Sequence, residues 1–188
     1  MRQTVILGTS PPTVDEVIAV ARGNALIEIG AAALDAMAVS RAHVDTLGHQ
    51  KTPVYGISTG FGALANRHIP PENRVQLQKS LIRSHAAGSG NEVEREVVRA
   101  TMFLRLKTLT SGRTGVRPEV ARTYADILNA GITPIVYEFG SLGCSGDLAP
   151  LAHCALVAMG EGEARGANGE VGEVADLLRA AGILPVEL

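Results

Sequence analysis

A glycine-rich segment, Gly-Ser-Leu-Gly-Cys-Ser-Gly over residues 140–146, carries the side chains with the clearest chemical potential in this sequence. It lacks the Gly-Lys-Ser/Thr ending of a phosphate-binding loop and the glycine spacing of a dinucleotide fingerprint. Around Ser145 it comes close to a nucleophile elbow. That motif requires one residue between the serine and its second glycine, whereas Gly146 follows Ser145 directly. The segment alone leaves two interpretations open, a serine hydrolase and a purely structural loop.

Two other segments contain residues that could take part in chemistry. Residues 53–69 begin with Pro-Val-Tyr55 and contain three glycines, which disfavour a stable helix or strand. Residues 81–88 contain Ser84 and His85 in a stretch with helical character. From the residues alone, a tyrosine of this kind more often anchors a loop, and a lone helical histidine is more often structural.

The two cysteines, Cys144 and Cys154, do not make a disulfide framework in a chain of 188 residues. His153 and Cys154 are adjacent and could suggest a pair of metal ligands. Adjacent side chains on a helix point about 100° apart, and no second Cys/His cluster accompanies them. We therefore predict no metal site and interpret the pair as half-buried residues on a helix.

Residues 140–153, Gly-Ser-Leu-Gly-Cys-Ser-Gly-Asp-Leu-Ala-Pro-Leu-Ala-His, closely resemble the signature of the aromatic amino acid ammonia-lyases. In that family a tripeptide, usually Ala-Ser-Gly, cyclises autocatalytically to a methylidene-imidazolone. The resemblance implies this group at Cys144-Ser145-Gly146, with no external cofactor. The amide nitrogen of Gly146 would attack the carbonyl carbon of Cys144, and Ser145 would become dehydroalanine. Cysteine departs from the usual alanine but is compatible, because its side chain stays outside the ring. The hydrolase interpretation then loses its motivation.

The residue types at these positions have physical reasons under this resemblance. A residue without Cβ at 146 minimises the steric barrier at the attacking nitrogen. Ser145 must lose its hydroxyl as water, which alanine cannot do. We expect Asp147 to cap the following helix in a supporting role. The positive end of that helix would then point toward the ring and favour electron build-up on it.

The family resemblance extends to two earlier segments. Residues 55–62, Tyr-Gly-Ile-Ser-Thr-Gly-Phe-Gly, resemble the lid loop that carries the catalytic tyrosine. This implies that Tyr55 is the base that removes the β-proton and that Gly62 contacts substrate. A phenol is a poor base near neutral pH, so the site would have to favour the phenolate.

Residues 81–88, Leu-Ile-Arg-Ser-His-Ala-Ala-Gly, resemble the substrate-selectivity segment. The pair at 84–85 is typically Phe-Leu in phenylalanine-specific relatives and His-Leu in tyrosine-specific ones. Ser84-His85 is similar to the histidine-specific members, and we expect both residues to bind substrate. An imidazole can exchange a hydrogen bond with a substrate imidazole, which an aliphatic side chain cannot do.

The resemblance implies a carbon–nitrogen lyase that converts L-histidine to trans-urocanate and ammonia. The alternatives are a tyrosine or phenylalanine ammonia-lyase, an aminomutase of the same family, or an inactive helical domain. Family members are more than twice this long and form homotetramers with shared active sites. Residues 1–188 are thus expected to be an N-terminal active-site domain, inactive alone. The missing C-terminal helical bundle would supply an Asn, a Tyr and an Arg.

The elements that must position these segments are mainly helical, with short strands around the loops. Thr13 and Glu16 form a capping-box pattern, and apolar residues recur at helical spacing in several later segments. We predict helices over 13–22, 31–47, 70–87, 92–110, 118–129, 147–159 and 173–181. We predict strands or extended segments at 4–7, 25–29 and 133–137, and a loop or hairpin at 161–172.

Composition excludes several other classes of protein. The chain is 46% hydrophobic, enough for a real core, and its net charge is −2 without a basic run or stripe. Nucleic acid and anionic membrane are therefore not expected as partners. Apolar stretches are interrupted before membrane-spanning length, and residues 1–10 lack the apolar core of a signal peptide. We predict a cytoplasmic protein.

Overall fold

The computed structural model describes residues 2–143 and 146–188. The expectations placed on Cys144 and Ser145 lie outside the described residues. Within them, the mainly helical prediction is confirmed, and the strands are short.

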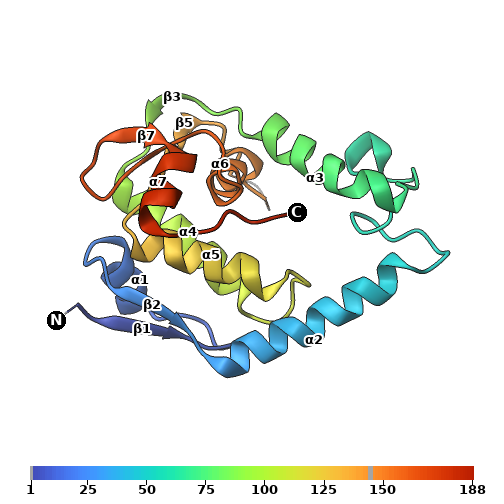
Figure 1. Cartoon of the computed structure of the whole chain (residues 1–188), viewed down its shortest axis with the longest axis horizontal. Coiled ribbons are helices and arrows are strands. Elements are labelled where there is room, and N and C mark those ends of the chain that lie inside the picture. Colours follow the sequence, from blue (N-terminus) through green and yellow to red (C-terminus); the bar gives the residue numbers. More distant parts are fainter. Residues whose placement is uncertain (1, 144–145) are drawn as a thin grey trace.

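Two helices in contact, α4 (Arg95–Leu109) and α5 (Pro118–Asn129), form the centre of the fold (Figure 1). Their facing side chains are almost fully buried: Val98, Met102, Phe103 and Leu106 from α4, and Ala121, Ile127 and Leu128 from α5. Val97, on the same helix, points away from this core and is 47% exposed. The helix also begins at Arg95 rather than at residue 92, because residues 89–92 pair as a strand.

The N-terminal unit is a parallel strand pair, β1 (Thr4–Leu7) with β2 (Leu26–Ile29), joined by α1 (Val14–Ala21). The predicted capping box is present, with Thr13 and Glu16 bonded in both directions. Helix α1 packs against α4. Arg99 is 1% exposed and donates to the carbonyl oxygens of Val20 and Leu128, so one guanidinium joins the ends of α1 and α5.

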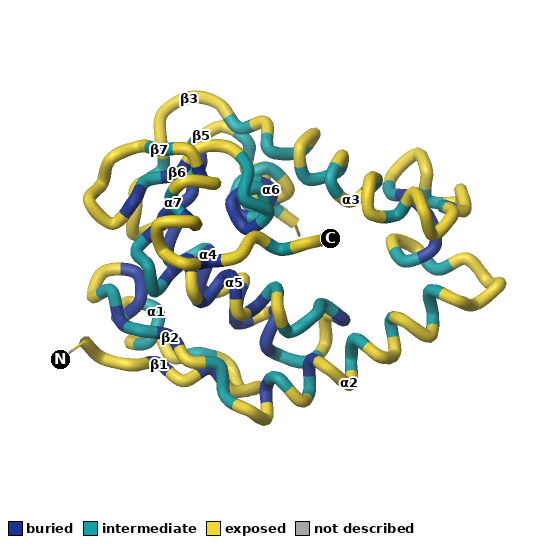
Figure 2. The backbone as a smooth tube through the Cα atoms, in the orientation of Figure 1, coloured by how far each residue is buried: buried dark blue, intermediate teal, exposed yellow. Residues whose placement is uncertain are grey.

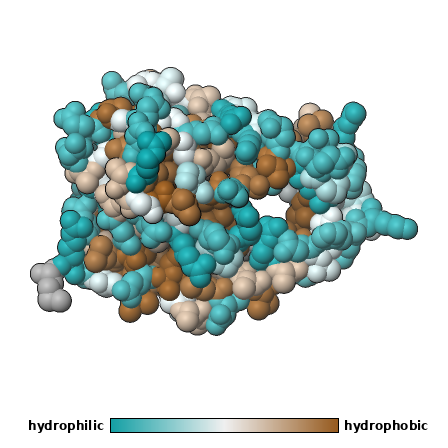
Figure 3. Space-filling view, in the orientation of Figure 1, coloured by the Kyte–Doolittle hydropathy of each residue, from teal (hydrophilic) through white to brown (hydrophobic). Residues whose placement is uncertain are grey.

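An arm made of α2 (Ala31–Gly48), the segment 49–70 and α3 (Pro71–His85) extends away from this body (Figure 1). A short 3-10 turn, η1 (Gly62–Leu64), lies within the segment. Most of the arm is exposed or half-buried, in contrast to the body (Figure 2). Arg74 donates to the carbonyl oxygens of Ile69 and Gly48, which fixes the base of the segment to α2. In the space-filling view, an opening separates the arm from the body (Figure 3).

The remaining elements lie around α6 (Leu148–Ala158). Strand β3 (Ser89–Glu92) pairs antiparallel with β5 (Tyr137–Phe139), and a second sheet has the order β4-β6-β7. The bounds of that sheet and of the last helix are β4 Thr133–Pro134, β6 Glu163–Arg165, β7 Val171–Glu173 and α7 Val174–Ala181. The hairpin expected within residues 161–172 is therefore confirmed by β6 and β7. None of the helices described is both long and apolar enough to cross a bilayer.

Candidate active site

The segment that carries Tyr55 is held together by its own hydrogen bonds. Ser58 and Thr59 are buried at 0% and 3% exposure, and the Ser58 hydroxyl accepts from the Val54 amide at 2.9 Å. The Tyr55 side chain is 61% exposed. Its ring packs edge-on against the ring of Phe61, with 5.8 Å between the ring centroids. The Gly62 amide donates to its phenolic oxygen at 3.4 Å. The loop therefore presents Tyr55 outward and places one backbone donor at the oxygen.

Ser84 and His85 occupy the last turn of α3. The Ser84 hydroxyl donates to the Leu81 carbonyl oxygen at 2.9 Å and lies 3.0 Å from His85 Nδ1. The same Nδ1 lies 2.8 Å from the Leu81 carbonyl oxygen. A carbonyl can only accept, so Nδ1 must be the donor in the neutral ring. This assigns the lone pair to Nε2, which is the atom able to accept from a ligand.

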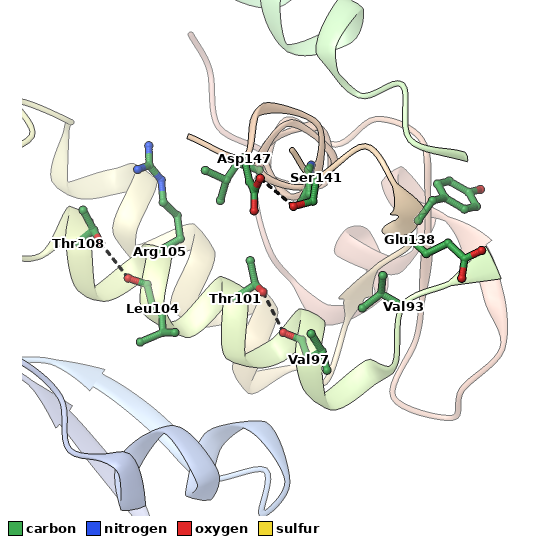
Figure 4. Close-up of a pocket in the computed structure, with 12 residues that line it drawn as sticks. Val93, Val97, Thr101, Leu104, Arg105, Thr108, Glu138, Ser141 and Asp147 are labelled. Atoms are coloured by element: carbon green, nitrogen blue, oxygen red, sulfur yellow. Dashed lines mark hydrogen bonds between the residues drawn. The ribbon is translucent and has the colours of Figure 1, made fainter. Parts of the chain in front are cut away.

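The loop before α6 is closed by Asp147. Its carboxylate accepts from the Ser141 hydroxyl at 2.8 Å and from the Leu142 amide at 3.2 Å (Figure 4). Asp147 occupies the N-cap position of α6 but makes no capping hydrogen bond with its side chain. The expectation that Asp147 caps this helix is therefore corrected. The carboxylate turns back toward two loop donors instead of the amides of the helix.

Two glycines flank the described ends of this loop. Gly143 has a φ of +60°, a left-handed conformation that favours glycine. A Cβ added at Gly146 would meet no described atom within 4 Å outside its own neighbours. Packing among the described residues therefore gives no reason for glycine at 146.

Two contacts connect the His85 end of α3 to α6 and the residues that follow it. Arg83 forms a two-pronged ion pair with Glu161, with N–O distances of 2.7 and 2.8 Å. This pair holds the pKa of the Glu161 carboxyl below its ordinary value. At a half-buried position, the Gly88 amide donates to His153 Nε2 at 3.1 Å. The two segments are thus joined at the surface and below it.

The predicted site residues fall into three local clusters. Tyr55 lies with Gly62, Ser84 with His85, and Asp147 beside the loop that leads to Gly146. Helix α3 has 15 residues, a length of about 22 Å, and separates the first cluster from the second. Within the described residues, no hydrogen bond or ring contact joins Tyr55 to either of the other clusters.

Sequence reasoning missed the loop contacts of Ser141 and the role of His153 as an acceptor. A half-buried histidine on an otherwise apolar helix signals that a polar partner must exist. The partner, Gly88, lies 65 residues away, so local patterns could not identify it.

The neighbouring Cys154 was expected to be half-buried, and this expectation is wrong, because the helix turns its side chain into the core. It is fully buried, and burial raises the pKa of its thiol to about 12, so the thiolate form is disfavoured near neutral pH. Over the residues that the structure describes, no three His, Cys, Asp or Glu side chains gather into a set suited to a metal ion.

A groove of about 480 Å³ runs along α4 and reaches the Asp147 loop (Figure 4). Its lining combines apolar side chains of α4 and α6, such as Leu104 and Leu151, with the charged groups of Arg105, Glu138 and Asp147. The close-up shows Ser141 and Asp147 bonded to each other at its edge.

Comparison with known proteins agrees with this arrangement of helices and loops. The model of the aromatic amino acid lyase family matches residues 13–188. Histidine ammonia-lyase of Streptomyces griseus is 65% identical over 185 residues, which cover 98% of this chain and 36% of that protein. The chain therefore spans about a third of the length of this curated relative.

Solved structures agree as well. An ergothionase from Treponema denticola superposes with a TM-score of 0.94 at 29% identity, covering 99% of this chain and 37% of the other. A tyrosine aminomutase from Streptomyces globisporus superposes with a TM-score of 0.90 at 36% identity, covering 98% and 34%.

The fold is therefore that of the helical aromatic amino acid lyases, and the sequence signature follows directly after β5. The chain belongs to the aromatic amino acid lyase family.

Proposed function

We propose that this chain is the N-terminal active-site part of an enzyme that deaminates L-histidine to trans-urocanate and ammonia. The observation that carries the proposal is the geometry of Ser84-His85, in a chain 65% identical to a histidine ammonia-lyase. The full-length protein would consist of this chain and a remainder of the kind that its relatives possess. Its site would be completed by that remainder and by other subunits of a homotetramer.

His85 would recognise the substrate ring. With Nδ1 donating to the Leu81 carbonyl, the Nε2 lone pair can accept an N–H from a substrate imidazole. The Ser84 hydroxyl also lies 3.0 Å from Nδ1 and keeps the ring in this orientation. Phenylalanine has no hydrogen-bond donor on its ring, so this pair favours histidine over phenylalanine.

Tyr55 would remove the β-proton of the substrate. As the phenolate takes the proton, the C–H electron pair becomes the new carbon–carbon double bond. The amine then leaves with the electrons of its C–N bond. The Gly62 amide donates to the phenolic oxygen at 3.4 Å and helps to orient it. Tyr55 is exposed on its loop, which suits a loop that closes over substrate bound by other parts of the assembled enzyme.

The signature Cys144-Ser145-Gly146 would provide the methylidene-imidazolone. This group supplies an electrophilic alkene that makes the substrate reactive toward loss of ammonia. The described flanks support this assignment, because the Asp147 carboxylate bonds the Ser141 hydroxyl and the Leu142 amide and so ties the residues before the segment to the start of α6. Glycine at 146 has no Cβ beside the attacking nitrogen, and packing among the described residues does not otherwise require glycine there.

An aminomutase is the second candidate, favoured by the structural similarity to a tyrosine aminomutase. It would yield a β-amino acid in place of an unsaturated acid and ammonia. A non-catalytic helical domain is the third, and it would leave the segment 144–146 uncyclised.

One experiment separates the three candidates. The full-length protein is incubated with L-histidine, L-tyrosine and L-phenylalanine, and the products are identified by chromatography with an assay for ammonia. The proposal predicts urocanate and ammonia from histidine as the preferred reaction. A β-amino acid product, a preference for tyrosine or phenylalanine, or no turnover by a tetramer with an uncyclised segment would overturn it.

A further inference from the structure

The end of the segment that carries Ser84 and His85 is fastened to α6 inside the molecule. After α3 ends at His85, the Ala87 amide donates back to the His85 carbonyl at 2.8 Å, forming a tight turn. The next amide, that of Gly88, leaves this turn and donates to His153 Nε2 at 3.1 Å. Three residues after His85, the chain is therefore bonded to the middle of α6.

Gly88 sits where three segments meet with no space for a side chain. A Cβ at this position would lie 3.1 Å from His153 Nε2 and 3.2 Å from Tyr137 Cβ. A Cβ on Gly140, at the start of the loop before α6, would lie 3.3 Å from Gly88 Cα. The backbone after His85, strand β5 and the loop toward residue 146 thus touch at one point.

The chemistry of the bond defines the state of His153. A backbone amide can only donate, so Nε2 must accept, and the proton of the neutral ring resides on Nδ1. The Tyr137 ring packs edge-on against the imidazole of His153, with 5.6 Å between the ring centroids, and restricts the orientation of the imidazole. Burial lowers the pKa of His153, which favours this neutral, accepting form. An imidazolium could not accept the amide.

The second link between the same segments is weaker. The Arg83–Glu161 pair has side-chain exposures of 51% and 34% and lies in screening solvent. Exposed ion pairs of this kind contribute little to stability. The half-buried bond between Gly88 and His153 is therefore the stronger of the two polar links, and it adds to the packing of α3 against α6.

We propose that His153 is a positioning residue of the lyase reaction, holding the substrate-ring segment at Ser84-His85 in register with α6 through the Gly88 amide. The inference rests on the proposed function, because it assigns recognition of the substrate ring to His85. It explains why a polar side chain stands in the middle of an apolar helix that begins beside the reactive loop.

The test uses two variants of His153 in the full-length protein and one control. His153→Gln retains an acceptor oxygen at a similar reach, whereas His153→Leu keeps bulk without an acceptor. Cys154→Ala is the control, because it truncates the adjacent buried side chain without contacting Gly88. Activity is expressed per intact electrophile, counted by mass spectrometry, so that a misfolded fraction does not affect the comparison.

For His153→Leu we expect kcat on L-histidine to fall by about tenfold to a hundredfold, since small misplacements of reacting groups are costly. KM should change much less, because His85 itself remains. His153→Gln should recover to within about threefold of wild type, and Cys154→Ala should keep wild-type kcat per electrophile while melting at a lower temperature. Equal kcat for the Leu variant and wild type, or equal losses for the Gln and Leu variants, would overturn the proposal.

Amide hydrogen exchange of residues 86–90 provides a readout that does not depend on activity. The Gly88 amide should be protected in wild type and in His153→Gln and should exchange faster in His153→Leu. An unprotected Gly88 amide in wild type would refute the register whatever the substrate is. If the Gly88 amide is protected as predicted but the protein does not act on histidine, the contact with His153 stands and the proposed function fails.

Discussion

His85→Leu should lower kcat/KM for L-histidine by about tenfold to a hundredfold in the full-length protein. In the wild type, Nδ1 of His85 is hydrogen-bonded to the Leu81 carbonyl and lies next to the Ser84 hydroxyl. Recognition of the substrate ring therefore depends on Nε2 alone. Leucine removes that acceptor and leaves the substrate N–H unpaired in the closed site. An unpaired buried polar group costs about 1–3 kcal/mol, and about 1.4 kcal/mol corresponds to a factor of ten.

The assay is the ratio of kcat/KM for histidine to kcat/KM for phenylalanine, measured in wild type and variants. Ser84→Ala is the matched control: it removes one partner of Nδ1 and keeps the Leu81 carbonyl, so its loss should stay within about threefold. Replacing Ser84-His85 by Phe-Leu should raise activity on phenylalanine from a low base. If the ratio fails to move toward phenylalanine in either His85 variant, residues 84–85 do not read the substrate ring.

Three further changes test the other roles. Tyr55→Phe should lower turnover by about 10²–10⁴ while the cyclised ring still forms, because only the proton acceptor is lost; normal turnover, or a missing ring, would assign Tyr55 a different role. Cys144→Ala should remain active, since the ring needs only the carbonyl of that residue; a folded but inactive variant would show that the thiol takes part. Asp147→Ala removes the acceptor of the Ser141 hydroxyl and the Leu142 amide, and the cyclised fraction counted by mass spectrometry should fall. Asp147→Asn keeps an acceptor oxygen and should lie between Asp147→Ala and wild type; a fully cyclised Asp147→Ala protein would show that the loop closes without the carboxylate.

The sequence predicted the helices whose starts are marked by residues close together in the chain. The capping box of Thr13 and Glu16 predicted the start of α1, and the helix predicted over 118–129 matches α5, which begins at Pro118. The alternation of helices and glycine-rich loops was sufficient to predict a mainly helical fold. These features depend on backbone propensity, which the sequence carries directly.

Features that depend on distant partners could not be predicted in this way. Residues 89–92, Ser-Gly-Asn-Glu, have no preference for strand, and they form β3 because β5 supplies a partner almost 50 residues later. Asp147 follows the pattern of a helix cap, yet two donors in the preceding loop draw its carboxylate away. The bond from Gly88 to His153 likewise exists only after α3 and α6 have packed together.

The mass of the full-length protein, and of its peptide covering residues 140–153, tests the central claim most directly. Cyclisation removes one water and dehydration of Ser145 removes another, so the peptide should be lighter than its sequence by two waters located at residues 144–146. Ser145→Ala has no hydroxyl to lose, so it should lack the second loss and be less active by more than about a thousandfold. A peptide of unmodified mass, from a protein that deaminates L-histidine at full rate, would contradict the account.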